Sequence, residues 1–347
     1  MGIIRLTGER AWRTYIGGAL IDRLHGKSGE DGHFPEEWIM SLTECRNSGR
    51  ENIKREGMSR LVGSGELLSD YISEHPELLG TRHFEKYGAD TGVLVKLIDS
   101  AERLSIQVHP TREKAMKYFG SSFGKTESWH ILGGREADDP CIYLGFREGV
   151  TAKRWREIFD AQDIDAMLGC LNRIKVKRGD TFLIKGGVPH AIGAGCFLLE
   201  VQEPTDYTLR TERTTVSGFH ISDEMCHQGI GFDRMMDCFE YDGVGLEKTL
   251  SKYKLIPRRS GAETVLIDYG DTPYFALGML ESEHDLVLKP SDVFCGLYVL
   301  EGSGKAMSDD SCESLAPGDQ FFVPSGTKVI FKVKQPLKLA RLYGPKV

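Results

Sequence analysis

The sequence predicts a mainly β fold of two small antiparallel barrels, with a helical insertion in the N-terminal part. Glycine supplies 40 of the 347 residues, well above the usual ~7%, and so many turn-forming residues favour short strands over a helical bundle. The apolar segments are short and are separated by glycine, proline and polar residues, which is typical of strands joined by turns. In addition, one strand-and-turn segment occurs twice along the chain.

The repeated segment indicates which kind of barrel to expect. GDTFLIKGGVPHAI begins at Gly179, GDQFFVPSGTKVIF begins at Gly318, and both follow the pattern G-D-x-F-[LF]-[IV]-x-x-G-[VT]. The segment YVLEGSGKAM, which precedes the second copy, has the strand–turn–strand pattern of a cupin's first motif. Internal similarity of this kind indicates two copies of one architecture, and a small antiparallel barrel of about eight strands belongs to the jelly-roll, or cupin, class. A common turn followed by a strand could also produce the match.

The repeat and the chain length together favour two domains. We expect the first domain to span residues 1–240, with the helical insertion at about residues 151–172, and the second to span residues 241–347. Where the first copy of the repeat has His190, the second has Val329. A site that uses this histidine therefore belongs to the first barrel, and the second barrel is expected to lack it.

Individual strands follow from short apolar runs. Residues 36–44 alternate weakly and are expected to form an edge strand. Further strands of the first domain are expected at residues 92–98, 104–108, 125–132, 141–146, 174–176, 181–184 and 196–202. From Leu246 to the C-terminus the pattern predicts short strands again.

Helices are expected at four places. Ser64 is a candidate cap for a helix that ends near Pro76. Thr111 is a candidate cap for a short helix that ends near Phe119. Apolar residues between Trp155 and Leu171 recur at the 3.6-residue period and predict the helical insertion. Residues 231–239 are the fourth candidate helix.

Composition and charge exclude several classes of protein. The formal net charge is −7 and no basic stretch stands out, so nucleic acid is not an expected partner. No apolar run approaches the ~18 residues of a membrane span, and the N-terminal MGIIRLTGER lacks the features of a signal peptide. The eight cysteines form no C-x-x-C pair. We therefore expect reduced thiols in a cytoplasmic protein.

Four side chains can converge on one metal site. Gln107 and His109 are two residues apart in LSIQVHP, and Glu127 lies in GKTESW. Residues two apart on a strand point to the same face of a sheet, so three neighbouring strands can direct these side chains and His190 into one pocket. Two imidazoles, a carboxylate and an amide oxygen suit zinc or iron. Taken alone, His109 could instead be a structural histidine at the end of a strand.

These motifs resemble those of type I mannose-6-phosphate isomerases. LSIQVHP, GKTESW, PHAIGAG and the spaced pattern E-x-Q-x-x-x-D-x-T-x-R from Glu200 to Arg210 match that family, and FPEEWIMSLTE is loosely similar to its early G-E-x-W-E-x-S segment. The clear similarity covers about residues 94–210, and a weaker C-terminal similarity extends it over most of the chain. The resemblance implies a two-cupin, zinc-dependent enzyme that interconverts mannose 6-phosphate and fructose 6-phosphate.

The resemblance also implies roles for individual residues. It makes one Zn²⁺ per chain the cofactor, with four ligands: Gln107, His109, Glu127 and His190. It places Ser105 beside the substrate phosphate, and it matches Lys125, Asp206 and Arg210 to the charged active-site residues of the family. The match departs just past Arg210, where the chain reads T-L-R-T-E-R in place of T-Y-R-[VL]-[YF]-D, and Lys185-Gly186-Gly187 replaces P-A-G. The departure puts the substrate in question more than the metal.

The chemistry of an aldose–ketose isomerase gives these residues their tasks. A proton moves between C1 and C2 through a cis-enediol(ate), and a zinc ion beside the sugar oxygens would act as a Lewis acid. Arg210 would stabilise the developing negative charge. Three groups are candidates for the base that removes the proton from carbon: Lys125, Asp206 and a zinc-bound water. Lys96 interrupts an apolar strand and is a further candidate for a phosphate contact.

Other functions fit the same residues. The alternatives are an isomerase of another hexose or hexose phosphate, an Fe(II) cupin oxygenase, and a non-catalytic sugar-binding cupin. For the isomerase, the expected partner is a small sugar phosphate of carbohydrate metabolism, and the protein is expected to be a monomer or a homodimer.

Overall fold

Two antiparallel sheets that face each other form the N-terminal barrel. In this computed structural model, which describes residues 2–47, 49–135 and 138–347, one sheet has seven strands in the order β13-β9-β6-β11-β4-β3-β2 and the other has five in the order β12-β5-β10-β7-β8. The seven strands are β2 (Glu9–Ala11), β3 (Glu36–Ile39), β4 (Leu94–Ser100), β6 (Glu127–Gly134), β9 (Thr181–Ile184), β11 (Cys196–Gln202) and β13 (Lys254–Leu255). The five are β5 (Gln107–Val108), β7 (Cys141–Phe146), β8 (Leu171–Lys175), β10 (His190–Ile192) and β12 (Leu209–Arg210).

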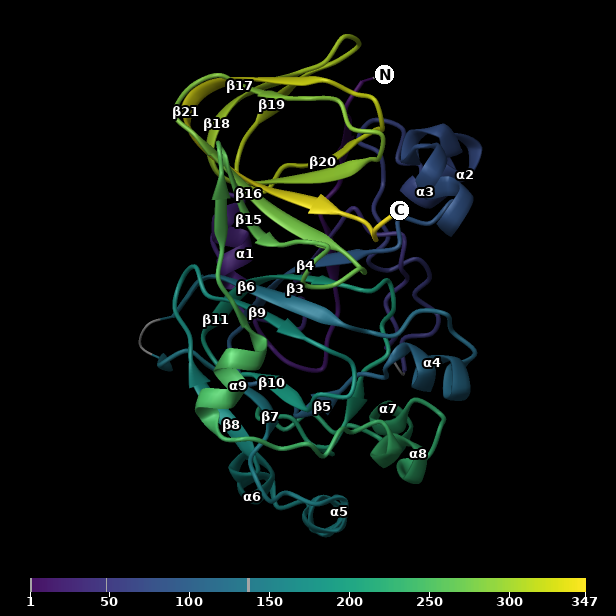
Figure 1. Ribbon diagram of the computed structural model, residues 1–347, viewed down its shortest axis with the longest axis vertical. Helices are drawn as coiled ribbons and strands as arrows, with labels where there is room; N and C mark the ends of the chain where they lie inside the picture. Colours follow the sequence, from purple (N-terminus) through teal and green to yellow (C-terminus); the bar gives the residue numbers. More distant parts are fainter. Residues whose placement is uncertain (1, 48, 136–137) are drawn as a thin grey trace.

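A third antiparallel sheet forms the C-terminal barrel. It has nine strands within the described residues, and it curves round on itself at the top of Figure 1. Its strands are β1 (Ile4–Leu6), β14 (Arg258–Ser260), β15 (Glu263–Ile267), β16 (Ala276–Ser282), β17 (Leu286–Leu288), β18 (Cys295–Met307), β19 (Cys312–Leu315), β20 (Gln320–Val323) and β21 (Val329–Tyr343). The structure therefore confirms the mainly β class with two barrels.

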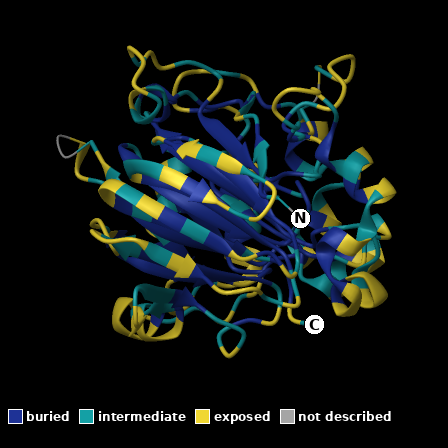
Figure 2. Ribbon diagram, turned by 90° about the horizontal axis from the view of Figure 1, so that it is seen from above, coloured by how far each residue is buried: buried dark blue, intermediate teal, exposed yellow. Residues whose placement is uncertain are grey.

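The seven-stranded sheet is buried on both faces. Successive strand residues point to opposite faces. Accordingly, Leu97 of β4 packs in the core shared with the nine-stranded sheet, whereas Ile98 packs against residues of the five-stranded sheet such as Ile142 and Ile192. Figure 2 shows the same arrangement, with buried residues in the middle of the molecule and exposed residues on the outer strands, loops and helices.

Helices cover the outside of the barrels. They are α1 (Ala19–Leu24), α2 (Leu68–Glu74), the 3₁₀ helix η1 (Pro76–Leu79), α3 (Thr81–Tyr87), α4 (Arg112–Phe119), α5 (Ala152–Ala161), α6 (Ile164–Gly169), α7 (Asp223–His227), α8 (Phe232–Asp237) and α9 (Leu246–Tyr253). Helices α5 and α6 are the predicted insertion, and Trp155 and Phe159 of α5 pack under the five-stranded sheet. The predicted cap of α4 is also confirmed, because the hydroxyl of Thr111 accepts a hydrogen bond from the backbone N–H of Lys114 at 3.2 Å.

The two copies of the repeat have the same local geometry. Gly179 and Gly318 have φ angles of 92° and 91°, which few residues other than glycine adopt readily. The aspartate that follows each glycine accepts a hydrogen bond from the backbone N–H three residues earlier, with Asp180 bonded to Lys177 at 3.2 Å and Asp319 to Ala316 at 2.8 Å. His190 then begins β10 and Val329 begins β21. The same position thus carries a histidine in one barrel and an apolar residue in the other.

Three predicted elements were wrong in detail. β3 spans only Glu36–Ile39 and is not an edge strand, because β2, too short to be seen in the sequence, pairs with its outer side. The strand expected at residues 104–108 is reduced to Gln107–Val108, since the N–H of Ile106 donates to the Glu212 carboxylate at 2.6 Å. Leu246–Tyr253 is a helix whose buried residues Thr249 and Tyr253 lie one turn apart.

The domain division at residue 240 stays a prediction. Strands cross it in both directions: β1 pairs with β20 of the C-terminal sheet, and β13 pairs with β9 of the seven-stranded sheet. No helix in the described ranges is long and apolar enough to cross a membrane, and all eight cysteines are free.

Candidate metal centre and active-site pocket

The metal-ligand candidates come together where the two N-terminal sheets meet. Gln107 pairs with His190 in the ladder between β5 and β10, and His109 follows two residues after Gln107. The carbonyl of His109 accepts a hydrogen bond from the N–H of Gly187 at 2.8 Å, which ties the end of β5 to the turn before β10. Glu127 begins β6 on the opposite sheet. His109, Glu127 and His190 therefore converge as the strand spacing predicts.

The distances within this group are short. His109, Glu127 and His190 offer ligand atoms that all lie within 4.8 Å of one another. The Nε2 atoms of the two histidines are 3.2 Å apart, and the Glu127 carboxylate lies 3.0 Å from Nε2 of His109 and 3.3 Å from Nε2 of His190. All three side chains are buried. Nζ of Lys125 lies 2.8 Å from Nε2 of His109 and also donates to the Glu127 carboxylate, and a metal ion between the three groups would use the same lone pairs.

Backbone carbonyls fix how the two imidazoles are protonated. Nδ1 of His109 donates to the carbonyl of Tyr207 and Nδ1 of His190 donates to the carbonyl of Val188, each at 2.8 Å. Burial lowers the pKa of both rings, that of His109 to about 3. Both imidazoles are therefore neutral near pH 7 with the proton on Nδ1, so both Nε2 lone pairs point at the same place. This is the arrangement by which histidine binds a metal.

The carboxylate of Glu127 completes the set. Burial alone would raise its pKa, but Lys125 holds it well below its usual value, so the group carries a negative charge. Its Oε2 accepts a hydrogen bond from Lys125, whereas its buried Oε1 has no hydrogen-bond partner. A buried acceptor without a partner is costly, and a bound cation would satisfy it.

These donors fit Zn²⁺. Two neutral imidazoles and one carboxylate form a common zinc ligand set. Oε1 of Glu127, which has no hydrogen-bond partner, and the Nε2 atoms of His109 and His190 lie around one common position. The amide of Gln107 reaches the same place, with Nε2 at 3.2 Å from Nε2 of His190. A half turn of the amide would present Oε1 instead, which is the atom that can bind a metal.

A small inner cavity adjoins the metal centre. Its volume is about 40 Å³, and its lining includes Gln107, Lys125, Ser105, Lys96 and Arg210. Lys125 is positioned by Glu203, whose carboxylate accepts hydrogen bonds from the backbone N–H groups of Gly124 and Thr126 at 3.3 and 2.9 Å. The Ser105 hydroxyl is buried and has no partner, so it is available to a ligand in this cavity.

A buried ionic network forms one wall of the inner cavity. The guanidinium of Arg13 contacts two carboxylates, that of Asp206 at 3.1 and 3.0 Å and that of Glu36 at 2.9 Å. Lys96 lies 3.2 Å from the Glu200 carboxylate and 3.8 Å from that of Glu36. Burial opposes ionisation of Asp206 and Glu36, but the neighbouring cations, Arg13 first, lower the pKa of each to about 2. The charges of Lys96 and Asp206 are thus already compensated within the protein.

Arg210 differs from the other basic residues of the cavity. Its guanidinium donates only to backbone carbonyls, those of Thr208 at 3.3 Å and Met225 at 3.2 Å, and no carboxylate of the described residues lies within ion-pair distance. Burial and the like charge of Arg13 lower its pKa, although a guanidinium remains charged. Arg210 is therefore a cation that lacks an anion.

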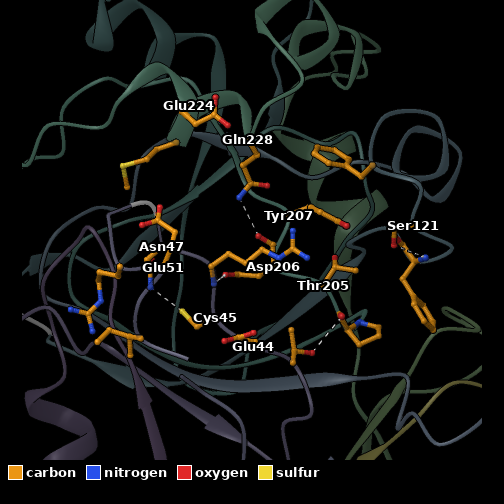
Figure 3. A pocket seen from close by; sticks show the side chains of 18 of the residues that line it. Glu44, Cys45, Asn47, Glu51, Ser121, Thr205, Asp206, Tyr207, Glu224 and Gln228 are labelled. Carbon is orange, nitrogen blue, oxygen red and sulfur yellow. Dashed lines mark hydrogen bonds between the residues drawn. The ribbon is translucent and has the colours of Figure 1, made fainter. Parts of the chain in front are cut away.

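A larger outer pocket of about 550 Å³ opens beyond the inner cavity, and Asp206 and Arg210 line both. Its walls are the loop of residues 43–47 and 50–54, the segment before β6, the residues around Asp206, and the region of α7. Figure 3 shows Asp206 and Tyr207 near the middle, with Glu224 and Gln228 on one side and Glu44 and Cys45 on the other. The two cavities thus meet at Asp206 and Arg210, and the inner one is bordered by Gln107 and Lys125 of the candidate metal centre.

The fold brings all the predicted site residues to one region, and the roles assigned to them stay predictions. The sequence reasoning missed three residues that shape the site: Arg13, Glu36 and Arg46. Glu36 could have been noticed, because it lies in the FPEEWIM segment. Arg13 has no local signal, since its contact with Asp206 joins residues 193 positions apart.

No family model matches the chain, but individual relatives do. The sequence is 26% identical over 279 residues to the mannose-6-phosphate isomerase ManA of Bacillus subtilis, with 80% of each chain covered. It is 34% identical over 202 residues to GmuF of the same organism, a probable mannose-6-phosphate isomerase, over 58% of this chain and 57% of that one.

Solved structures agree with the fold. A mannose 6-phosphate isomerase from Bacillus subtilis matches with a TM-score of 0.75 at 22% identity, over 98% of this chain and 99% of that one. A mannose 6-phosphate isomerase bound with zinc and yttrium matches with a TM-score of 0.74 at 16% identity, over 100% of both chains. The two-cupin fold predicted from the repeat is thereby confirmed.

Proposed function

Because this chain belongs to the type I mannose-6-phosphate isomerase family, we propose that it is a zinc-dependent aldose–ketose isomerase that interconverts mannose 6-phosphate and fructose 6-phosphate. One observation carries the proposal: the Nε2 atoms of two imidazoles lie next to Oε1 of Glu127, which has no hydrogen-bond partner. The cavity beside them is lined by Lys125 and Arg210. An anionic metal site beside basic groups suits a reaction in which negative charge develops on sugar oxygens.

One Zn²⁺ per chain would be held by His109, Glu127 and His190, with Gln107 as a fourth ligand after its amide turns. Bound there, the ion would supply Lewis acidity toward the sugar oxygens at C1 and C2. The chain's own residues position the sugar and handle the proton. Arg210 places a fixed positive charge beside the inner cavity, where it would stabilise the cis-enediolate.

Lys125 is the proposed proton carrier between C1 and C2. Its Nζ lies 2.8 Å from Nε2 of His109 and lines the inner cavity, so it reaches the place where the reacting carbons would lie. Asp206 is less suited to be the base, because its carboxylate is bound by Arg13 and by the N–H of Arg46 at 2.9 Å. A carboxylate with a pKa of about 2 is also a weak base. Ser105 would accept or donate a hydrogen bond to a sugar hydroxyl.

The wider setting follows from the same proposal. The partner is a small sugar phosphate in the cytoplasm, and neither nucleic acid nor a membrane takes part. A monomer would be sufficient, because the residues named above all come from one chain, and a homodimer is equally compatible.

The test combines metal analysis with an assay on one sample. Elemental analysis of purified protein is expected to give about one zinc per chain, and the same protein is expected to convert mannose 6-phosphate into fructose 6-phosphate. EDTA should abolish turnover and added Zn²⁺ should restore it. Zinc-loaded protein that isomerises no hexose phosphate would overturn the proposal. Equal kcat/KM values for mannose and mannose 6-phosphate would indicate an isomerase of free sugars instead. Oxygen consumption with added Fe(II) would indicate an oxygenase.

A further inference from the structure

We infer that Arg46, together with Arg210, forms the anion subsite of this protein, so that the phosphate of the substrate binds in the outer pocket while the reacting carbons face the metal centre. This inference rests on the proposed function and deepens it. It assigns the charged end of the sugar to the loop of residues 45–47 and 49–54, which the sequence motifs of the site do not include.

Arg46 is a cation held in place without an ion pair. Its guanidinium lies over the ring of Tyr207, 5.3 Å from the ring centroid, and both residues line the outer pocket. No carboxylate of the described residues lies within ion-pair distance of it. A cation–π contact favours this position of the guanidinium while its N–H groups stay free to bind an anion. A phosphate in this pocket would therefore meet a donor that already lies at the pocket wall.

Arg210 supplies the inner half of the subsite. It lines both cavities and donates only to two carbonyls, so its charge is available to a ligand on either side. Arg46 and Arg210 are connected through one short segment, because the backbone N–H of Arg46 donates to Asp206 at 2.9 Å and Asp206 lines both cavities with Arg210.

The inner cavity is unsuited to the phosphate. Its volume of about 40 Å³ is that of a few water molecules. Lys96 at its wall is already compensated by Glu200 and Glu36, and a phosphate dianion there would meet those two carboxylates and Asp206. The partnerless hydroxyl of Ser105 suits a sugar hydroxyl there.

Acidic side chains also line the outer pocket, but two of them hold the loop together. The Glu44 carboxylate accepts the backbone N–H of Arg55 at 2.6 Å, and that of Glu51 accepts the N–H of Gly49 at 2.8 Å. Their contacts keep the loop folded in the shape that presents Arg46. Both carboxylates keep their negative charge, so an anion in this pocket has to be held by direct contacts with basic side chains such as Arg46 and Arg210.

The test compares Arg46→Ala with Arg46→Lys and with Arg55→Ala. Arg55 belongs to the adjoining loop but does not line the pocket, and its side chain is 57% exposed. In zinc-loaded Arg46→Ala, KM for mannose 6-phosphate is expected to rise about tenfold, as for the loss of one charged hydrogen bond, with kcat nearly unchanged. KM for free mannose should not change. Arg46→Lys should regain part of the loss, and Arg55→Ala should behave like wild type.

A binding measurement separates this inference from the proposed function. Titration calorimetry with inorganic phosphate needs no turnover, and it should show about tenfold weaker binding to Arg46→Ala than to wild type. Wild-type phosphate affinity in Arg46→Ala, with the affinity lost in Ser105→Ala, would overturn the inference and move the phosphate to the inner cavity. Absent turnover by the wild type would instead refute the proposed function, and the phosphate titration would still decide on Arg46.

Discussion

The backbone carbonyl of Tyr207 accepts the Nδ1 proton of His109 at 2.8 Å, while the ring of Tyr207 lies beneath the guanidinium of Arg46. One residue thus orients the imidazole of a candidate metal ligand through its backbone and contacts a basic residue of the outer pocket through its side chain. The preceding residue, Asp206, is held by Arg13. Since such outer partners set the orientation of metal ligands, the metal centre and the pocket share one short supporting segment.

Replacement of His190 by alanine is expected to abolish metal binding. The change removes one of three buried ligands, and the remaining imidazole and carboxylate cannot close a zinc site. Elemental analysis should give about one zinc per chain for the wild type and almost none for His190→Ala. His75→Gln is the matched control, because His75 has a 45% exposed side chain and lies outside the site. Equal zinc contents in wild type and His190→Ala would refute the assignment.

The convergence of the candidate metal ligands was predictable from the sequence, because strand spacing directs side chains to a common face. Gln107 and His109 share a face by the two-residue period, and the repeat separates His190 from a merely structural residue. The ionic network was not predictable, since Arg13 meets Glu36 and Asp206 only after three distant segments have folded together. The strands expected from Leu246 onward were wrong for α9, whose Leu246, Leu250 and Tyr253 do follow the helical spacing, and β2 gave no signal because three residues are too short a strand to show alternation.

A methyl group at Gly187 is expected to weaken metal binding. Gly187 has a φ of 90°, and a Cβ there would lie 2.7 Å from Cγ of Glu240. Its N–H also bonds to the carbonyl of His109, so a shift of this turn moves a ligand. We expect Gly187→Ala to lose zinc to a chelator at least tenfold faster than wild type, as is typical when a supporting contact is lost.

Gly149→Ala is the control for that experiment. Gly149 has a similar φ of 86°, but a Cβ there would meet no atom of the described chain within 4 Å beyond its immediate neighbours, and it is remote from the ligands in the sequence. The change should introduce only backbone strain, which lowers the unfolding free energy by about 1–2 kcal/mol. Zinc should be released from this variant at the wild-type rate. Faster zinc release from both variants would show that strain, and not the contact with His109, is responsible.

Lys125→Met should stop proton transfer at the sugar carbons while leaving the metal bound. The side chain keeps its length but loses the ammonium group, so the proposed proton carrier is removed. In deuterated water the wild type should exchange the C2 proton of mannose 6-phosphate, and Lys125→Met should do so at least a hundredfold more slowly, in line with general acid–base contributions. The zinc content of both proteins is measured alongside. Undiminished exchange would assign the base elsewhere.

Arg13→Met should destabilise the fold strongly. It leaves Glu36 and Asp206 buried without their shared cation, and removing one partner of a buried ion pair costs about 3–5 kcal/mol. Urea unfolding should report this loss. The triple variant Arg13→Met, Glu36→Gln, Asp206→Asn should regain part of the stability, because neutral amides do not need the cation. A triple variant less stable than Arg13→Met would contradict this account of the network.

The same network predicts how stability depends on pH. Glu36 and Asp206 have pKa values of about 2 in the folded protein, because Arg13 and Lys96 outweigh the effect of burial, whereas they titrate near 4.3 and 3.9 in an unfolded chain. A folded pKa below the unfolded one stabilises the fold above the unfolded pKa, and this stabilisation is lost as the pH falls from about 4 to about 2.

Arg13→Met lacks the principal cation that lowers both pKa values. The unfolded states cancel in the difference in unfolding free energy between wild type and Arg13→Met, so this difference depends only on the folded-state pKa values, which burial raises in the variant. Measured with urea on EDTA-treated proteins, the difference should therefore shrink as the pH falls from the raised values of the variant toward about 2, and it should be clearly smaller at pH 3 than at pH 7. A difference that is unchanged at pH 3 would show that Arg13 stabilises the fold by packing rather than by its charge.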